Sequence, residues 1–260
     1  MKILERINEK LRKSYWMLGA GLMLVVALSA ARVKSHSHTS KLVVEIESLG
    51  DKGGFLILER DVKRIIQNSF VEEIDGMDLD RVQLDRMEKV LEDDAFVKDA
   101  EVWIDANNKV HIKVQQRQPI IRIIDNNGLN YYLDQEGNKI PTSKYATARV
   151  PVATGELPAY FREYKDSENP LNDVLKLAIF LKKNKILDAM ISQISVMKSG
   201  DLVLTPEFGK TKIILGKADD MSRKFEKLII FYKEAIPIEG WRKYKTINLK
   251  FANQVVCKRW

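Results

Sequence analysis

The hydrophobic pattern is dominated by one segment, Tyr15 to Ala31, which contains 17 residues without a charge. A bilayer core about 30 Å thick requires roughly 17–25 apolar helical residues, so this segment predicts a transmembrane helix over 15–31. Five basic and two acidic side chains precede it. The positive-inside rule therefore predicts that residues 1–14 form a cytoplasmic tail and that the chain from Arg32 onward lies across the membrane.

A cleaved signal peptide is the alternative interpretation of this segment. The triplets Ala27–Ser29 and Ser29–Ala31 both fit the small-x-small pattern of a cleavage site. However, the run is longer than the usual apolar region of about 7–15 residues. The charges of Arg32 and Lys34 follow it directly. Both features favour an uncleaved anchor.

The next residues, 32–40, lack periodicity and predict a polar linker that includes His36 and His38. A compact unit is expected over 41–115, because strand and helix periodicities then follow one another in a regular order. Asp80, with Gln83 three residues later, resembles a capping box that would open the second helix. The predicted elements are a strand over 42–47, a helix over 59–70, a helix ending near Glu92, and strands 100–105 and 110–114 joined in a hairpin by Asn107-Asn108.

A second domain, over 116–260, is predicted to be rich in strands. The predicted strands are 120–124, 131–133, 191–196, 202–205, 211–215, 245–251 and 255–258. Two main helices are expected, with apolar stripes that are interpreted as core faces. The stripes are Leu171, Val174, Leu175, Ala178 and Leu181 in one helix, and Met221, Phe225, Leu228, Ile229, Tyr232 and Ile236 in the other. The predicted fold class is α+β: an N-terminal transmembrane helix, a β-α-α-β-β domain and a mixed β-rich domain.

Composition argues against most other classes of function. The formal net charge is +7, of which residues 1–31 contribute +3, five basic minus two acidic side chains, leaving +4 for the rest. This dispersed excess does not support nucleic-acid binding. The single cysteine, Cys257, excludes an intrachain disulfide. No phosphate loop, dinucleotide motif or nucleophile elbow is present. The sequence predicts no enzyme, no metal or cofactor site and no small-molecule substrate.

Five short strings follow one another along the chain in an order typical of one family. They are Asp94–Val102, Gln116-Arg117-Gln118-Pro119, Leu133-Asp134-x-x-Gly137 with Ile140-Pro141, Val150-Pro151-Val152-x-x-Gly155, and Lys245–Phe251. Together with the anchor, they resemble the FtsQ/DivIB family of bacterial cell-division proteins. The chain departs from the family pattern at Gln116, Asn248 and Lys250, where the family has Glu, Asp and Arg.

This resemblance implies a non-catalytic scaffold in the cell inner (plasma) membrane at the division septum, with a cytoplasmic N-terminus and extracytoplasmic C-terminal domains. Residues 41–115 would form a POTRA domain and 116–260 a β domain. The C-terminal edge of the β domain would bind an FtsB-like protein and, with it, an FtsL-like protein, linking early and late division proteins and controlling septal peptidoglycan synthesis. The partner-binding residues expected on this basis are Phe251, Val255, Val256, Cys257 and Trp260.

Two alternatives remain open at this point. Phe251 could instead share a core face with Ile247 and Leu249, and Val255 and Cys257 could be buried rather than in contact with a partner. At the level of function, the alternative is a POTRA-containing envelope assembly or secretion factor. Such proteins usually carry several POTRA repeats, whereas this sequence predicts one.

Overall fold

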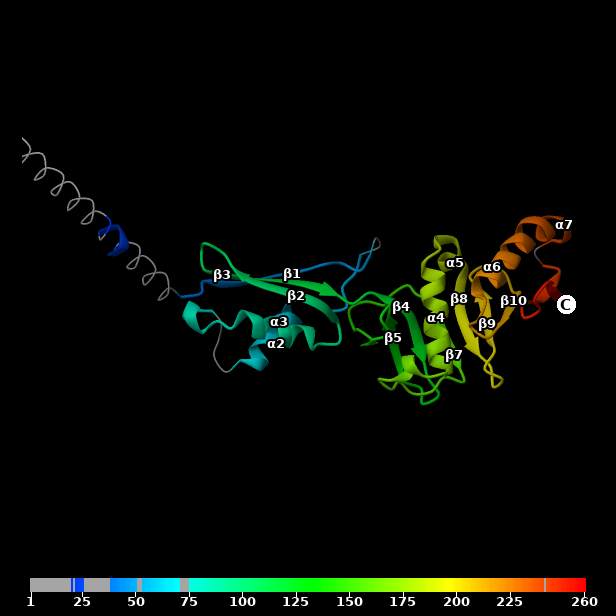
Figure 1. Ribbon diagram of the computed structural model, residues 1–260, viewed down its shortest axis with the longest axis horizontal. Coiled ribbons are helices and arrows are strands. Elements are labelled where there is room, and N and C mark those ends of the chain that lie inside the picture. Colours follow the sequence, from blue (N-terminus) through cyan, green and yellow to red (C-terminus); the bar gives the residue numbers. More distant parts are fainter. Residues whose placement is uncertain (1–19, 21, 26–37, 51–52, 71–74, 241) are drawn as a thin grey trace, which may run out of the picture. The chain divides into compact units, whose positions relative to one another are not determined.

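The computed structural model describes residues 20, 22–25, 38–50, 53–70, 75–240 and 242–260 (Figure 1). The predicted cytoplasmic tail 1–14, most of the predicted anchor 15–31 and residues 32–37 of the predicted linker lie outside them. No helix among the described residues has the length and apolar character needed to cross a membrane. The described chain divides into two compact units, and Ser48–Ile57 and Asp94–Lys98 belong to the same unit as Gln115–Trp260.

The first unit has the predicted β-α-α-β-β order. Its elements are β1 (Lys41–Ile46), α2 (Glu59–Ser69), α3 (Leu84–Glu92), β2 (Val97–Ile104) and β3 (Lys109–Gln116). The strands form a three-stranded sheet in the order β1-β3-β2, with β1 parallel to β3. Figure 1 shows both helices on one face of this sheet. Val62 and Leu91 are fully buried, one from each helix, because the apolar stripes of the helices cover the alternating apolar residues of the strands.

The predicted capping box at Asp80 is wrong. Asp80 lies in a short 3-10 turn, Leu79–Arg81, and Val82 after it is extended, with ψ at 112°. The extended residue separates that turn from α3, whose N-cap is Gln83. Within the predicted linker, His38 forms an isolated β-bridge with Asp78, and their side chains approach to 2.7 Å.

One turn design recurs in three hairpins, after Asp105, Asp125 and Asp134. In each hairpin the aspartate Oδ1 accepts hydrogen bonds from the backbone N–H groups two and four residues later. The residue three positions later has positive φ: 61° at Asn108, 76° at Gly128 and 81° at Gly137. Asparagine and glycine tolerate this conformation, which explains why the Asn-rich and Gly-containing turns were readable in the sequence.

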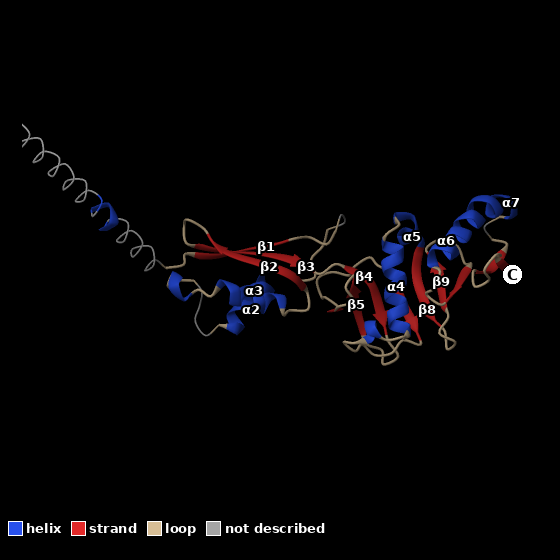
Figure 2. Cartoon of the chain, in the orientation of Figure 1, coloured by secondary structure: helices blue, strands red, loops and turns tan. Residues whose placement is uncertain are grey.

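The second unit is built on a nine-stranded sheet in the order β12-β11-β10-β9-β8-β7-β4-β5-β6. Figure 2 shows strands and helices of this unit by colour. Its strands are β4 (Pro119–Ile124), β5 (Asn130–Asp134), β6 (Lys139–Pro141), β7 (Val152–Gly155), β8 (Ile191–Val196), β9 (Leu202–Pro206), β10 (Lys212–Gly216), β11 (Tyr244–Asn248) and β12 (Val256–Arg259). The sheet is mixed: β7 is parallel to both β4 and β8, and β10 is parallel to β11.

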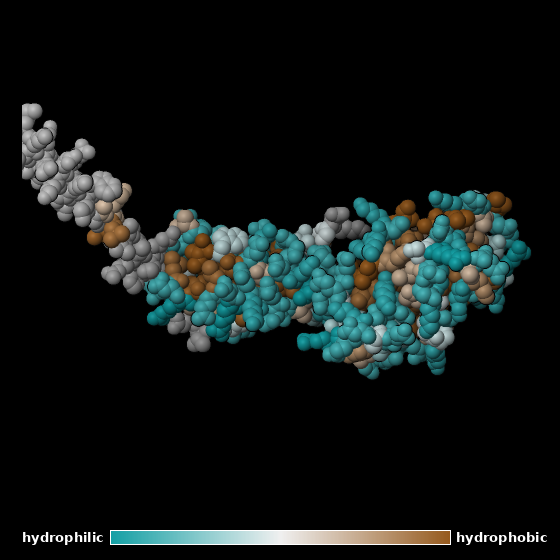
Figure 3. All heavy atoms as spheres, in the orientation of Figure 1, coloured by the Kyte–Doolittle hydropathy of each residue, from teal (hydrophilic) through white to brown (hydrophobic). Residues whose placement is uncertain are grey.

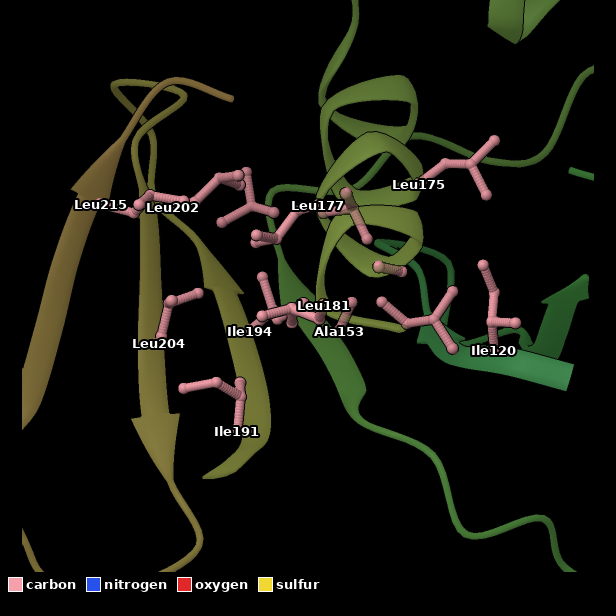
Figure 4. Close-up of a cluster of buried hydrophobic side chains, with 14 of the residues drawn as sticks. Ile120, Ala153, Leu175, Leu177, Leu181, Ile191, Ile194, Leu202, Leu204 and Leu215 are labelled. Atoms are coloured by element: carbon pink, nitrogen blue, oxygen red, sulfur yellow. The ribbon is translucent and has the colours of Figure 1, made fainter. Parts of the chain in front are cut away.

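The core of the second unit lies between this sheet and its helices. The main helices are α4 (Pro170–Lys182), followed by α5 (Lys185–Met190), and α6 (Met221–Ile230). Figure 4 shows Leu177 and Leu181 of α4 facing strand residues such as Ile194. All three side chains are fully buried. The first predicted stripe is therefore a core face, and in the second stripe Phe225, Leu228 and Ile236 are buried.

The helix that begins with α6 changes its pitch before it ends. A π-helical stretch, Phe231–Ala235, leads into the short helix α7 (Ile236–Glu239). The backbone N–H of Ile236 bonds to the carbonyl of Phe231, five residues back. The next residue, Pro237, has no N–H to donate and its ring crowds the carbonyl four residues earlier. The wider π turn removes this conflict.

Candidate functional site

The last strand, β12, forms one end of the nine-stranded sheet. It pairs antiparallel with β11, so that Cys257 lies opposite Ile247 and Val256 opposite Asn248. No strand of the described chain pairs with its other side. The opposite end of the sheet is β6, a three-residue strand that ends in the exposed Pro141. Because a short strand with a terminal proline offers few backbone donors, β12 is the better edge for strand addition.

The predicted site residues on β12 and directly before it divide between two faces. Cys257 and Val255 are half-buried and pack against the core. Val256 points the other way and is 41% exposed. Burial raises the pKa of the Cys257 thiol. The thiol is therefore protonated at neutral pH, which does not suit a nucleophile.

The predicted aromatic contact residues are both exposed. Trp260 is 66% exposed, and the ammonium of Lys245 lies over its ring, 5.6 Å from the centroid. Phe251 is 46% exposed, whereas Ile247 and Leu249 are fully buried, so a shared core face for the three is wrong. The reason is that β11 ends at Asn248, whose side-chain oxygen accepts the backbone N–H of Lys250 and turns the chain. Phe251 therefore lies in the turn between β11 and β12 and not in a strand.

The edge is strongly basic. Residues 240–260 contain six Lys and Arg side chains and no Asp or Glu. Lys258 and Arg259 lie on β12 itself and are exposed. Lysine on an edge strand discourages unspecific pairing with other apolar strands. The same charges favour a partner segment that carries carboxylates.

Exposed apolar residues also occur on the helical segment that carries the predicted second stripe, on faces outside that stripe. Ile230 is 52% exposed and Ile238 is 85% exposed. Figure 3 shows hydrophobic residues reaching the surface along the α6–α7 segment. Exposed aliphatic side chains of this size are candidates for contact with another protein.

Two of the family-like strings meet in a buried ion pair. Arg117 donates to the Asp134 carboxylate at 3.1 Å, and the two side chains are 17% and 7% exposed. The neighbouring Gln116 accepts the backbone N–H groups of Leu56 and Ile57 at 2.6 and 3.3 Å. These contacts give the strings a structural role. A glutamate at position 116 would accept the same two bonds.

The hairpin of the first unit contains a histidine–carboxylate contact. His111 lies 3.0 Å from the Asp105 carboxylate and stacks on the Trp103 ring, with centroids 5.3 Å apart. The pKa of Asp105 is lowered by the backbone hydrogen bond from Lys109 and by His111. In the part of the chain that the structure describes, no group of three or more His, Cys, Asp or Glu residues is placed to hold a metal ion.

The sequence did not predict the helical side chains that form hydrogen bonds with the turn before β12. Lys227 and Arg223 of α6 contact the β11–β12 turn across 22 to 30 residues of sequence. A contact over that distance leaves no periodic or motif signal.

The fold defines a class of protein: a POTRA-like unit joined to a β-rich unit that has an open C-terminal edge. Comparison with protein families agrees with both parts, matching a POTRA-like domain over residues 39–115 and the family "FtsQ/DivIB, C-terminal related" over 118–258. The second match covers more than half of the chain. The chain belongs to the FtsQ/DivIB family.

A curated relative agrees with this assignment. The chain is 28% identical over 157 residues to the "Cell division protein FtsQ" of Rhodothermus marinus. The alignment covers 57% of this chain and 55% of the relative. The chain thus spans about half of the length of the curated relative it matches.

Proposed function

We propose that the chain is a non-catalytic, membrane-anchored scaffold of the bacterial division complex that recruits a partner through β12. The observation that carries this proposal is the position of β12 as the open terminal strand of the nine-stranded sheet. The proposed organisation is a cytoplasmic tail (1–14), an anchor (15–31), a linker (32–40), a POTRA domain (41–115) and a β domain (116–260). The extracytoplasmic domains would act at the septum.

In the proposed complex, an FtsB-like protein adds a strand to β12 and brings an FtsL-like protein with it. Backbone hydrogen bonds would supply affinity, and alternate side chains would supply specificity. Val256 and Trp260 are exposed and offer apolar contact. Phe251 lies in the adjoining turn, and Val255 and Cys257 would support the strand from the core side. The trimer would link early and late division proteins and control septal peptidoglycan synthesis.

The basic edge makes the proposal more specific. Lys258 and Arg259 lie where a paired segment would run, and no acidic side chain occurs between residues 240 and 260. We therefore expect the added strand to carry Asp or Glu at positions facing these two cations. Complementary charge at the rim of an interface accelerates association and excludes wrong partners more than it raises affinity.

The test is affinity capture of the tagged full chain from detergent-solubilised membranes. A chain ending at Ala252 should lose two small single-pass coiled-coil proteins while circular dichroism shows an intact fold. Reversing both charges, Lys258→Glu with Arg259→Glu, should weaken capture, whereas Lys210→Glu in the loop before β10 should not. If the truncated chain retains both proteins, the site lies elsewhere. If the full chain captures neither, the scaffold proposal is wrong.

A further inference from the structure

The edge strand β12 has little support of its own. It contains four residues and pairs with one neighbouring strand only. The preceding turn, residues 249–255, connects it to β11 and includes the exposed Phe251 and Asn253. A short terminal strand frays readily unless other contacts hold its entry.

Two cationic side chains of α6 hold this turn. The ammonium of Lys227 donates to the backbone carbonyls of Leu249, at 3.1 Å, and Phe251. One helical turn earlier, the guanidinium of Arg223 donates to the side-chain oxygen of Asn253. Residues four apart lie on the same face of a helix, so the two cations contact successive parts of the turn.

The helix that carries these cations is itself firmly placed. Phe225 and Leu228 of α6 are buried, with at most 1% of either residue exposed. The Phe225 ring stacks on Phe180 of α4, with centroids 5.2 Å apart. On the far side of the turn, Lys250 donates to the Asp201 carboxylate at 2.8 Å. The turn is therefore bonded both to α6 and, through Lys250, to the residue that precedes β9.

The two cations do not contribute equally. Lys227 is half-buried and bonds to two carbonyls, whereas Arg223 and Asn253 are both exposed. A charge-assisted hydrogen bond to a partly buried group stabilises more than an exposed one, which water and salt screen. Lys227 is accordingly the main contact and Arg223 the secondary one.

We propose that Lys227, assisted by Arg223, is a positioning residue that holds β12 in the conformation able to accept a partner strand. This inference rests on the proposed function. The proposed effect is preorganisation. Because the turn is already ordered in the free protein, binding of the partner does not include the entropy cost of ordering it. Neither cation needs to contact the partner.

The chain contains its own reporter for this proposal. Cys257 is the only cysteine and lies on β12, half-buried against the core. A thiol reagent applied to the native full chain in detergent therefore measures how often β12 opens. Lys227→Met loses both hydrogen bonds to the turn and should raise the labelling rate at least about tenfold, the factor that corresponds to one lost charge-assisted hydrogen bond. Lys227→Arg should restore the slow rate, and Lys233→Met, an exposed lysine of the same helical segment, should leave it unchanged.

The second readout is partner capture from membranes with the same variants. The proposal requires Lys227→Met to weaken capture by a similar factor while the urea midpoint of the core stays near that of the parent chain. Asn253→Ala, on the exposed turn, should give a smaller effect of the same sign and does not endanger folding. Labelling at the parent rate in Lys227→Met overturns the proposal, and so does faster labelling with unchanged capture. If the parent chain captures no partner, the proposed function fails, whereas the labelling rates still decide whether Lys227 holds β12.

Discussion

Replacement of Gly155 by alanine should destabilise the second unit strongly. Gly155 ends β7 with φ at +98°, and it pairs with Val196 of the parallel neighbour β8. A Cβ at this position would lie 2.2 Å from the Val196 carbonyl oxygen and 3.0 Å from its carbonyl carbon. Both atoms belong to the backbone of a central strand, so they cannot move aside as a flexible side chain would.

The expected magnitude has two parts. Placing alanine at this φ costs about 1–2 kcal/mol. Relieving the clash requires β7 and β8 to separate. This separation breaks the 3.0 Å hydrogen bond from the Glu156 N–H to the Val196 carbonyl and strains the neighbouring residue pairs of the two strands. Each broken buried bond costs about 1–3 kcal/mol. The sum is about 2–5 kcal/mol.

Gly209→Ala provides the matched control. Gly209 also has positive φ, +89°, but no atom lies within 4 Å of the Cβ it would acquire. It should therefore show only the conformational part, about 1–2 kcal/mol. Urea unfolding of the full chain in detergent, followed by circular dichroism, measures both variants. Equal losses of stability in the two variants would refute the steric argument.

Three further predictions concern other parts of the second unit. Arg117→Met removes the cation paired with the buried Asp134 carboxylate, which still accepts the backbone N–H groups of Glu136 and Asn138, and should cost about 1.5–3 kcal/mol in urea unfolding, part of which Asp134→Asn should recover in the double variant. The hydrogen bond from Lys250 lowers the pKa of Asp201 in the folded chain. The ionised Asp201 therefore stabilises the fold above its unfolded pKa, near 4, and this stabilisation is lost as the pH falls through the lower folded pKa. The urea midpoint should therefore fall from pH 7 to pH 3, and less so in Asp201→Asn. Pro237→Ala supplies the missing backbone donor and should stabilise the segment by about 1–3 kcal/mol, with α-helical hydrogen bonds replacing the π turn in NMR spectra.

Elements with a local signal were predictable from the sequence. The helices over 59–69 and 170–182 follow from apolar residues at helical spacing. The hairpin of β2 and β3 follows from alternation and an Asn-containing turn. In each case the residues that decide the structure lie within a few positions of one another.

Elements defined by distant neighbours were not predictable. Strand β7 has four residues, too few for a periodic signal, and is a strand because β4 and β8 flank it in parallel. The three-residue β6 is defined in the same way by β5. The position of Phe251 in a turn, beyond the end of β11 at Asn248, also escaped prediction, because an alternating pattern does not mark where a strand ends. At the candidate site, the edge position of β12 was expected from the chain order, whereas its support by Lys227 depends on a contact that sequence does not encode locally.

The unequal ends of the nine-stranded sheet set the stoichiometry of any assembly built on it. Strand β6 closes one end with three residues and Pro141, whereas β12 leaves the other end open. A sheet with two open ends would be divalent, and copies could join into an unlimited chain. If strands are added at β12 alone, as the proposed function has it, each copy takes one partner segment and the complex stops growing there.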